Sequence, residues 1–414
     1  FQELKIKAFS KKEVRQYIKN YVQKKGYMLN LSEDTYLQHI TKIPEELVSN
    51  PILLKITLTV LPRFIEQGRT IQISRIDLYD EFLKTWFNRA HERLRNIRMT
   101  AEEKKIFRTL DDDNFPESCL QFSKDFATEM FLDNNKVVIT NKTNWKKFLG
   151  NEDTKNSLLR FSMPLIRREN QYWFLHKTLR DHLIAQALLD ELLEPCESAL
   201  TALFNKQSFV SEHGVRQFLA EHISQKTETF KPLLAFIEAS KNNEVKIASA
   251  NASTILTQVD ALLENLNDCN ISGADLRKGS FNNLQAEGAK LNNVNFENAK
   301  LNNANLQSSS MQCANLQNAE LNNANLQSSS MQGANLQNAR LQFTSLRGSS
   351  LQSEYRVPQI LYNEVEVYGK FWEIKFEDAQ LNLARWKSDG LTQPVVLKSL
   401  HKQFEQDPEV NTFK

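Results

Sequence analysis

The chain has 414 residues, and its 52 Lys and Arg nearly balance its 50 Asp and Glu, so the formal net charge is only +2. This balance excludes a global field that would favour nucleic acid or acidic partners. The cysteines contain no closely spaced pair, which argues against a disulfide scaffold or a zinc ribbon and favours a reducing, cytoplasmic location. No apolar run reaches the length of about 18 residues that a membrane-spanning helix needs, so no membrane contact is expected.

Residues 1–110 have the pattern of a helical domain. Ser10 and Glu13 form a capping box before a helix, and a short helix is predicted from Ser32 to Ile40. Pro51 suits the first turn of the apolar helix that follows it. The segment Ser74–Asp77 then caps a long amphipathic helix.

Residues 111–194 mix helix and strand signals. A helix is predicted over residues 117–131 and a short strand over residues 136–140. In residues 164–176, PLIRRENQYWFLH, two apolar runs flank a polar turn, which predicts a β-hairpin, and a helix is expected from Lys177 to Leu193. A hairpin beside helices is typical of a winged-helix unit. Residues 195–268 are expected to form a helical linker domain whose last helix spans Ala248 to Leu266.

The order of these elements and their local sequences resemble the second half of a NACHT module. NACHT modules are the nucleotide-binding cores of the STAND class of signalling ATPases, which includes the NOD-like receptors. The matching segments are KIKAFSKKEVRQYIKNYV, SNPILLKITLTVL, SRIDLYDEFLKTWFNRA with its "LY" pair at Leu78 and Tyr79, and FLHKTLRDHLIAQAL. The last of these resembles the winged-helix word Phe-x-His-x-(Ser/Thr)-Phe-Gln-Glu-(Phe/Tyr)-x-Ala and covers the helix start after the hairpin.

The resemblance implies two nucleotide-contact residues. Pro51 would lie against the adenine, and His176 would contact the ADP phosphate and help to hold the resting state. The chain departs from the family word where Leu179, Arg180, Asp181 and His182 stand. Taken without the family, His176 lies where a hairpin meets a helix start, so it either meets a ligand there or caps and braces the joint.

A STAND ATPase needs a P-loop to hold phosphates, and no Gly-x-x-x-x-Gly-Lys-(Ser/Thr) occurs in this sequence. The triplet Asp111–Asp113 is expected to be a solvated acidic loop. We therefore expect no catalytic residue, no metal site and no cofactor in this chain. The resemblance implies that the catalytic half lies upstream of Phe1, and that ADP or ATP with Mg²⁺ binds only in a full-length parent.

Residues 301–320 and 321–340 match at 18 of 20 positions, and a finer period of five lies inside this repeat. A large apolar residue recurs every fifth position, with a small residue two positions before it. A period of five fits neither a helix nor a flat strand, but it fits a chain that turns a corner every five residues and stacks coil on coil. The predicted core residues are Leu276, Phe281, Leu291, Phe296, Leu301, Leu306, Met311, Leu316, Leu321, Leu326, Met331, Leu336, Leu341 and Leu346.

The words ANLQS, ANLQN and ADLRK resemble the pentapeptide-repeat family, whose motif is Ala-(Asp/Asn)-Leu-x-x. The resemblance implies a right-handed quadrilateral β-helix over residues 269–353. The strict phase disfavours the alternative, a disordered Asn/Gln/Ser-rich tract. At Ala286 the pattern inverts, because the bulky Leu284 stands where the small residue belongs. The fold class is thus α+β and multidomain, and residues 354–414 are expected to cap the β-helix or to start a further module.

Two functions from different classes remain. In the first, the chain is the non-catalytic regulatory and protein-interaction portion of a STAND-type ATPase that oligomerises on activation, with the rod as sensor or scaffold surface. In the second, it is a stand-alone pentapeptide-repeat scaffold or a nucleic-acid-mimicking inhibitor, because some family members imitate DNA with an acidic rod. Residues 269–353 carry four acids and six bases, which is the wrong sign for a mimic and too few cations to bind nucleic acid. The expected partners are therefore proteins.

Overall fold

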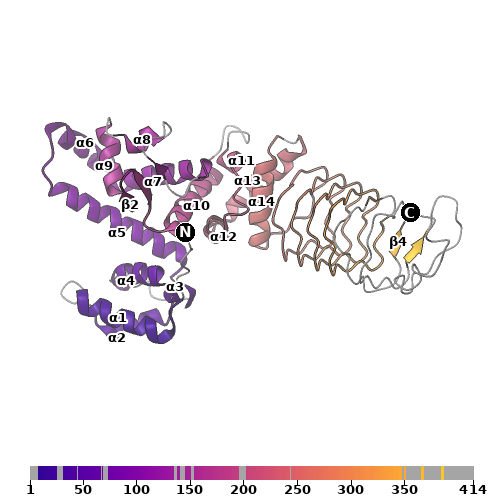
Figure 1. Ribbon diagram of the computed structural model, residues 1–414, viewed down its shortest axis with the longest axis horizontal. Helices are drawn as coiled ribbons and strands as arrows, with labels where there is room; N and C mark the ends of the chain where they lie inside the picture. Colours follow the sequence, from indigo (N-terminus) through magenta and orange to yellow (C-terminus); the bar gives the residue numbers. More distant parts are fainter. Residues whose placement is uncertain are drawn as a thin grey trace. The chain divides into compact units, whose positions relative to one another are not determined.

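The computed structural model describes residues 8–25, 31–43, 45–66, 68, 73–134, 138–139, 145–150, 153–194, 202–242, 244–346, 349–350, 365–367 and 384–386. The chain divides into two compact units, residues 1–187 and 188–414. Figure 1 shows that helices make up most of the first unit and that a stack of coils dominates the second. The mostly helical first half and the β-helix near the C-terminus agree with the sequence prediction.

The first unit contains ten helices and three strands in its described part. The described part of this unit begins with five helices, of which several neighbours pack on one another, and the helix that begins at Pro51 packs on the long helix that begins at Arg75. They are α1 (Lys11–Lys25), α2 (Glu33–Ile40), α3 (Glu45–Ser49), α4 (Pro51–Glu66) and α5 (Arg75–Arg95). The remaining elements are α6 (Ala101–Asp112), α7 (Phe115–Leu132), β1 (Val138–Ile139), α8 (Lys146–Leu149), α9 (Thr154–Ser162), β2 (Leu165–Arg168), β3 (Gln171–Phe174) and α10 (Lys177–Leu193).

Helix α5 starts where its sequence predicts. The Ser74 side chain accepts a hydrogen bond from the backbone N–H of Asp77, while the Asp77 carboxylate accepts one from the backbone N–H of Ser74 at 3.0 Å. These two bonds satisfy N–H groups that the first turn of a helix leaves without partners. Further along α5, the Trp86 indole N–H donates to the carbonyl of Ser162 at 2.9 Å, which fixes α9 against α5.

The predicted hairpin is confirmed. Strands β2 and β3 pair antiparallel with Leu165 opposite Phe174, and β1 adds to the other side of β3 to give the order β1-β3-β2. The turn is tight because Glu169 adopts a positive φ of 54°. Phe174 turns inward and meets Phe126 edge-on at 5.8 Å, so the hairpin packs on the aromatic core of α7.

The second unit begins with helices that precede the coils. They are α11 (Leu203–Lys206), α12 (His213–Gln225), α13 (Phe230–Ala239) and α14 (Lys246–Gln258), with 3₁₀ turns at Thr227–Thr229 and Ser240–Asn242. Helix α14 packs against α11, α12 and α13, and its residues 248–257 are all buried. A separate parallel pair consists of β4 (Val365–Val367) and β5 (Ala384–Trp386).

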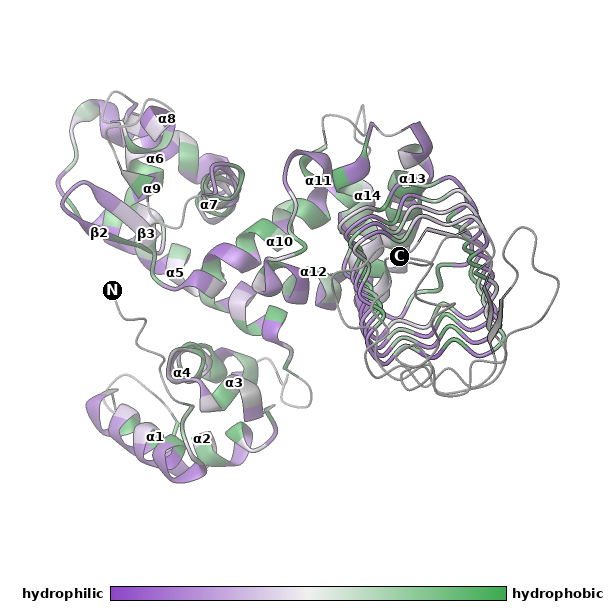
Figure 2. Ribbon diagram, turned by 45° about the vertical axis from the view of Figure 1, so that its right-hand side comes forward, coloured by the Kyte–Doolittle hydropathy of each residue, from purple (hydrophilic) through white to green (hydrophobic). Residues whose placement is uncertain are grey.

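Each coil of the rod takes 20 residues. Isolated parallel bridges join residues 20 apart, from Asn265 with Gln285 to Ser330 with Ser350. Between coils, Leu301 N–H donates to the Glu320 carbonyl at 2.6 Å and Asn303 N–H donates to the Asn322 carbonyl at 2.9 Å. Figure 2 shows these coils stacked on one another. Every five-residue step therefore repeats one short strand contact and one turn.

The turns explain why Asn or Gly recurs at one polar position of the repeat. The second residue after each large apolar residue has positive φ, for example Asn303 at 59° and Asn323 at 58°. Asn and Gly tolerate this left-handed conformation better than other residues. The same requirement accounts for Gly333 at φ 70°, and Phe343 at 56° is a bulky exception.

Hydroxyl side chains of the helices complete the first coil. In later coils, N–H groups such as that of Asn295 donate to a carbonyl of the preceding coil. The first coil has no predecessor in the rod, so Asn270 N–H donates to Ser240 Oγ and Asp275 N–H donates to Thr254 Oγ1, both at 2.9 Å. The 3₁₀ turn after α13 and helix α14 thus cover an edge that would otherwise be open to pairing.

Two expectations about local structure are wrong. The last helix ends at Gln258, not at Leu266, because Leu263 and Leu266 are buried and the regular bridges already begin at Asn265. The rod therefore starts before residue 269. The Asp111–Asp113 triplet is not a solvated loop either, since α6 runs to Asp112 and the Asp111 carboxylate contacts His91 at 2.8 Å and Arg95 at 2.9 Å.

Candidate functional site

The start of helix α10 brings three side chains from two distant segments together. His176 precedes the helix, and its Nδ1 atom lies 2.6 Å from Thr178 Oγ1 and 3.3 Å from the Thr178 backbone nitrogen. Tyr79 of α5 places its hydroxyl in hydrogen-bond contact with the same Thr178 Oγ1. His176 therefore caps the first turn of α10, and Thr178 connects it to α5.

Burial sets the electrostatics of this joint. Desolvation lowers the pKa of the half-buried His176, so its neutral form is favoured. Desolvation also raises the pKa of Tyr79, whose side chain is fully buried, although the Thr178 hydrogen bond acts in the opposite sense. Both rings therefore enter the joint uncharged near neutral pH.

A second polar contact joins the same two helices one turn further along. The Asp80 carboxylate accepts hydrogen bonds from His182 Nε2 and from the Gln186 amide, each at 2.8 Å. His182 is fully buried, and its ring lies 5.3 Å from that of Tyr79. The contact between His182 and Asp80 thus gives α5 and α10 a second polar connection.

Pro51, the other predicted nucleotide-contact residue, opens α4 and is half-buried. Helix α4 packs on α5, and the contacts described above join α10 to α5. Pro51 and His176 thus lie on two elements that share α5 as their neighbour. These contacts do not test the adenine role of Pro51 or the phosphate role of His176, so both roles stay predictions.

The rod supplies the second candidate site, a surface rather than a cleft. All fourteen predicted core residues are buried, with at most 7% of any one exposed. Leu284 and Ala286, where the pattern inverts, are both buried as well, so the bulky residue fills the space that the small one leaves. The core therefore holds the outward side chains in fixed columns.

Those outward columns are rich in amide side chains that bond to one another. Asn315 donates to Asn295 and Asn335 donates to Asn315, both at 3.1 Å, and Asn325 donates to Asn305 at 3.2 Å. Identical side chains stacked one coil apart form such ladders in other cross-β structures. The stacked amides are uncharged, and each is oriented by its neighbour in the next coil.

The first coil carries the main ion cluster of the rod. Asp275 contacts Arg216 of α12 and Arg277 of the rod, each at 2.7 Å. Burial alone would raise the pKa of Asp275, but hydrogen bonds and charge from Arg277 and Arg216 outweigh burial and hold this pKa below its usual range. The cluster ties α12 to the rod, and nothing in the sequence spacing points to it, because residues 216 and 275 are far apart.

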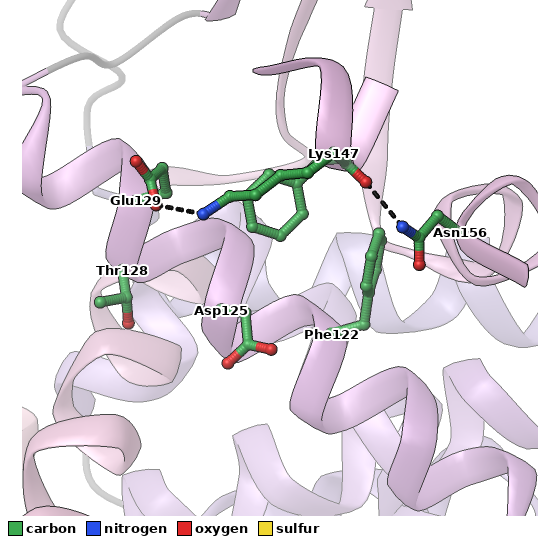
Figure 3. Close-up of a pocket in the computed structure, with 7 residues that line it drawn as sticks. Phe122, Asp125, Thr128, Glu129, Lys147 and Asn156 are labelled. Atoms are coloured by element: carbon green, nitrogen blue, oxygen red, sulfur yellow. Dashed lines mark hydrogen bonds and ion pairs between the residues drawn. The ribbon is translucent and has the colours of Figure 1, made fainter. Parts of the chain in front are cut away.

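A hollow of about 400 Å³ lies between α7, α8 and α9 in the first unit. Figure 3 shows Lys147 extended across it toward Glu129, with a 2.7 Å ion pair, while Asn156 donates to the Lys147 carbonyl. The Lys147 amine also lies 4.9 Å from the centre of the Phe148 ring. The hollow is therefore bridged by the protein's own side chains, and no residue singled out from the sequence lines it.

Two further site types are absent from the part of the chain that the structure describes. No group of three or more His, Cys, Asp or Glu side chains there is arranged to hold a metal ion. Among the described helices, none combines the length and apolar character needed to cross a membrane.

Comparisons with known proteins identify the rod segment. The family model for pentapeptide repeats (8 copies) matches residues 280–318, 289–327 and 314–352. Residues 280–352 are therefore pentapeptide repeats. No curated protein matches the chain.

Three solved structures are similar to part of the chain. A pentapeptide repeat protein (Rfr23) from the cyanobacterium Cyanothece 51142 is 34% identical over 23% of this chain and 60% of its own, with a TM-score of 0.20. QnrB1, a plasmid-mediated fluoroquinolone resistance protein, is 15% identical over 32% of this chain and 64% of its own, with a TM-score of 0.25. The pentapeptide repeat protein alr5209 from Nostoc Pcc 7120 is 25% identical over 22% of this chain and 85% of its own, with a TM-score of 0.14. The chain thus spans less than two thirds of the first two of these proteins.

Proposed function

We propose that this chain is the regulatory and protein-interaction portion of a STAND-type signalling ATPase, with the pentapeptide-repeat rod as its sensor or scaffold surface. One observation carries the proposal. Tyr79 and His176, which the NACHT resemblance singles out from segments about a hundred residues apart, meet through Thr178 at the start of α10. In the proposed function, this joint would connect the nucleotide contact of His176 to helix α5.

The rod supports the interaction part of this function. Its amide ladders hold uncharged hydrogen-bonding groups in columns, for example Asn295, Asn315 and Asn335. Repeat arrays of this kind present extended, rigid faces built from neighbour contacts. A protein partner that pairs with oriented amides fits such a face better than nucleic acid does, because phosphate contacts need clustered cations.

The finer expectations belong to the same proposal. They are a winged-helix unit within residues 111–194, a right-handed quadrilateral β-helix over residues 269–353, and a cap or further module over residues 354–414, which lies almost entirely outside the described residues. The proposal also assigns the adenine contact to Pro51 and the ADP phosphate contact to His176. It places the switch in the cytoplasm, makes it oligomerise on activation, and leaves ATP chemistry with Mg²⁺ to a catalytic half outside this chain.

The coding sequence upstream of Phe1 tests this proposal. We expect a P-loop of the form Gly-x-x-x-x-Gly-Lys-(Ser/Thr) within a few hundred residues, because no other motif holds the phosphates in this class. A continuous upstream sequence without a P-loop would rule the STAND assignment out.

A stand-alone pentapeptide-repeat scaffold is the second candidate, and the match over residues 280–352 favours it. It needs no nucleotide and would keep the same interaction surface. A nucleic-acid mimic is a poorer fit, because two of the rod's few carboxylates are already paired. Asp275 contacts two arginines, and Glu320 lies 3.6 Å from Arg340.

A further inference from the structure

The donor and the acceptor of each hydrogen bond around Thr178 can be assigned. A backbone N–H can only donate, and that of Thr178 points at His176 Nδ1 at 3.3 Å. A proton on Nδ1 would therefore face the proton of the Thr178 N–H. With Nδ1 as the acceptor, the Thr178 hydroxyl at 2.6 Å donates to the same nitrogen. Thr178 Oγ1 then accepts from the Tyr79 hydroxyl.

This arrangement leaves one place for the proton of a neutral imidazole. When Nδ1 accepts, Nε2 carries the hydrogen. Burial lowers the pKa of His176, which keeps the ring neutral near pH 7. Tyr79 has no exposed surface, so its hydroxyl is shielded from water and remains available to Thr178.

We propose that Tyr79 and Thr178 are positioning residues that hold His176 in its Nε2–H tautomer, so that Nε2 donates a hydrogen bond to an anionic phosphate group. The proposal rests on the proposed function for its ligand, but the tautomer itself is a property of the chain alone. A phosphate oxygen only accepts hydrogen bonds, so the opposite tautomer would present a lone pair to it and repel it. We call the hydrogen bonds from Tyr79 through Thr178 to His176 the relay. Through the relay, a side chain of α5 sets which nitrogen of His176 can donate a hydrogen bond.

Nitrogen NMR of ¹⁵N-histidine-labelled chain tests the tautomer without any nucleotide. The chain has seven histidines, and the His176 signals are identified by their loss in His176→Ala. At pH 7 we expect an unprotonated, hydrogen-bonded Nδ1 and a protonated Nε2. A His176 that is mainly protonated at Nδ1, or an even mixture of tautomers, would overturn the proposal.

Variants of the relay separate positioning from general support of the fold. In Thr178→Val, Nδ1 loses its hydroxyl donor, so its resonance moves toward that of a free imidazole acceptor, and Thr178→Ser restores it. Tyr79→Phe moves the same resonance in the same direction by less. The matched control is Tyr36→Phe, which removes the hydroxyl of another buried tyrosine. Unchanged Nδ1 and Nε2 resonances in Thr178→Val would contradict the relay.

Failure of this proposal is distinguishable from failure of the proposed function. If the tautomer and its dependence on Thr178 are as predicted but no P-loop precedes the chain, the relay stands and the STAND assignment falls. If a P-loop is present and ADP binding needs His176, but Nδ1 carries the proton, the relay falls and the assignment stands. With ADP as the probe in the full-length protein, Thr178→Val should weaken binding about threefold to tenfold, as expected for loss of one hydrogen bond.

Discussion

Asp275 shows how one residue links the two parts of the second unit. Its carboxylate is 10% exposed and contacts Arg216 of α12, which is also 10% exposed, and Arg277, which is 46% exposed. Removing the charge would leave Arg216 buried without its ion-pair partner in this cluster. Such a loss costs more than an ordinary surface ion pair, because the remaining charge keeps its desolvation penalty.

We therefore expect Asp275→Asn to destabilise the second unit by roughly 1–3 kcal/mol at pH 7. The pKa of Asp275 is lower in the folded protein than its unfolded value of about 3.9, so its contribution is fully present above that value. This stabilising contribution is lost as the pH falls through the folded pKa of Asp275. The difference in unfolding free energy between wild type and variant should therefore vanish once the pH lies below that folded pKa, itself below about 3.9. Denaturant unfolding across this pH range measures it, with the exposed Glu287→Gln as the control that should change little.

At the scale of elements, the cap on the first coil depends on hydroxyl groups of the 3₁₀ turn after α13 and of α14. Thr254 Oγ1 accepts the N–H of Asp275 at 2.9 Å while donating to the Ala250 carbonyl of its own helix. Thr257 makes the equivalent bond to Ser253, but no bond from its hydroxyl to the rod is seen in the described residues. The two threonines therefore form a matched pair that isolates the contact with the rod.

Thr254→Val keeps the shape of the side chain and leaves the Asp275 amide without its acceptor. We expect a loss of about 1–3 kcal/mol in the stability of the first coil, because a buried donor without a partner keeps its full desolvation cost. Hydrogen exchange over residues 270–280 should accelerate in Thr254→Val and much less in Thr257→Val. Equal exchange in the two variants would show that the hydroxyl does not cap this edge.

Local signals predicted these elements well where the cause of the structure is local. The capping box of Ser74 with Asp77 and the hairpin around Glu169 follow from neighbouring residues. The end of α14 was missed because Leu263 and Leu266 continue an apolar pattern that fits a helix, yet they pack in the rod. The positive-φ turns were also missed, although the recurrent Asn at those positions is the signal that could have revealed them.

At the scale of the whole molecule, the rod's near-identical coils predict that its length changes in fixed steps. Deleting residues 321–340 joins Glu320 to Leu341 in phase, so one coil disappears and the rod shortens by about 4.8 Å. We expect this variant to fold and melt cooperatively. Deleting residues 321–337 instead breaks the five-residue phase, exposes core positions and should give a lower melting temperature in circular dichroism. Equal melting of the two deletions would contradict the stacked-coil account.

The candidate site was predictable only in part. The NACHT resemblance singled out Tyr79 and His176, but the sequence could not show that Thr178 joins them, since that contact depends on how α5 and α10 pack. The Asp80 contact with His182 was missed for the same reason: a histidine that departs from the family word carries no local sign of a partner 102 residues away. The rod core, by contrast, was predictable because each residue follows from the five-residue phase.

The ADP affinity of the full-length protein tests most directly whether the joint between α5 and α10 belongs to a nucleotide switch. His176→Ala should weaken ADP binding about tenfold to a hundredfold, which is the loss expected when a hydrogen bond to a charged group is removed. The exposed His213→Ala, on α12, is the matched control and should leave the affinity unchanged. Equal affinities of the wild type and His176→Ala would contradict the assignment and leave His176 as the cap of α10.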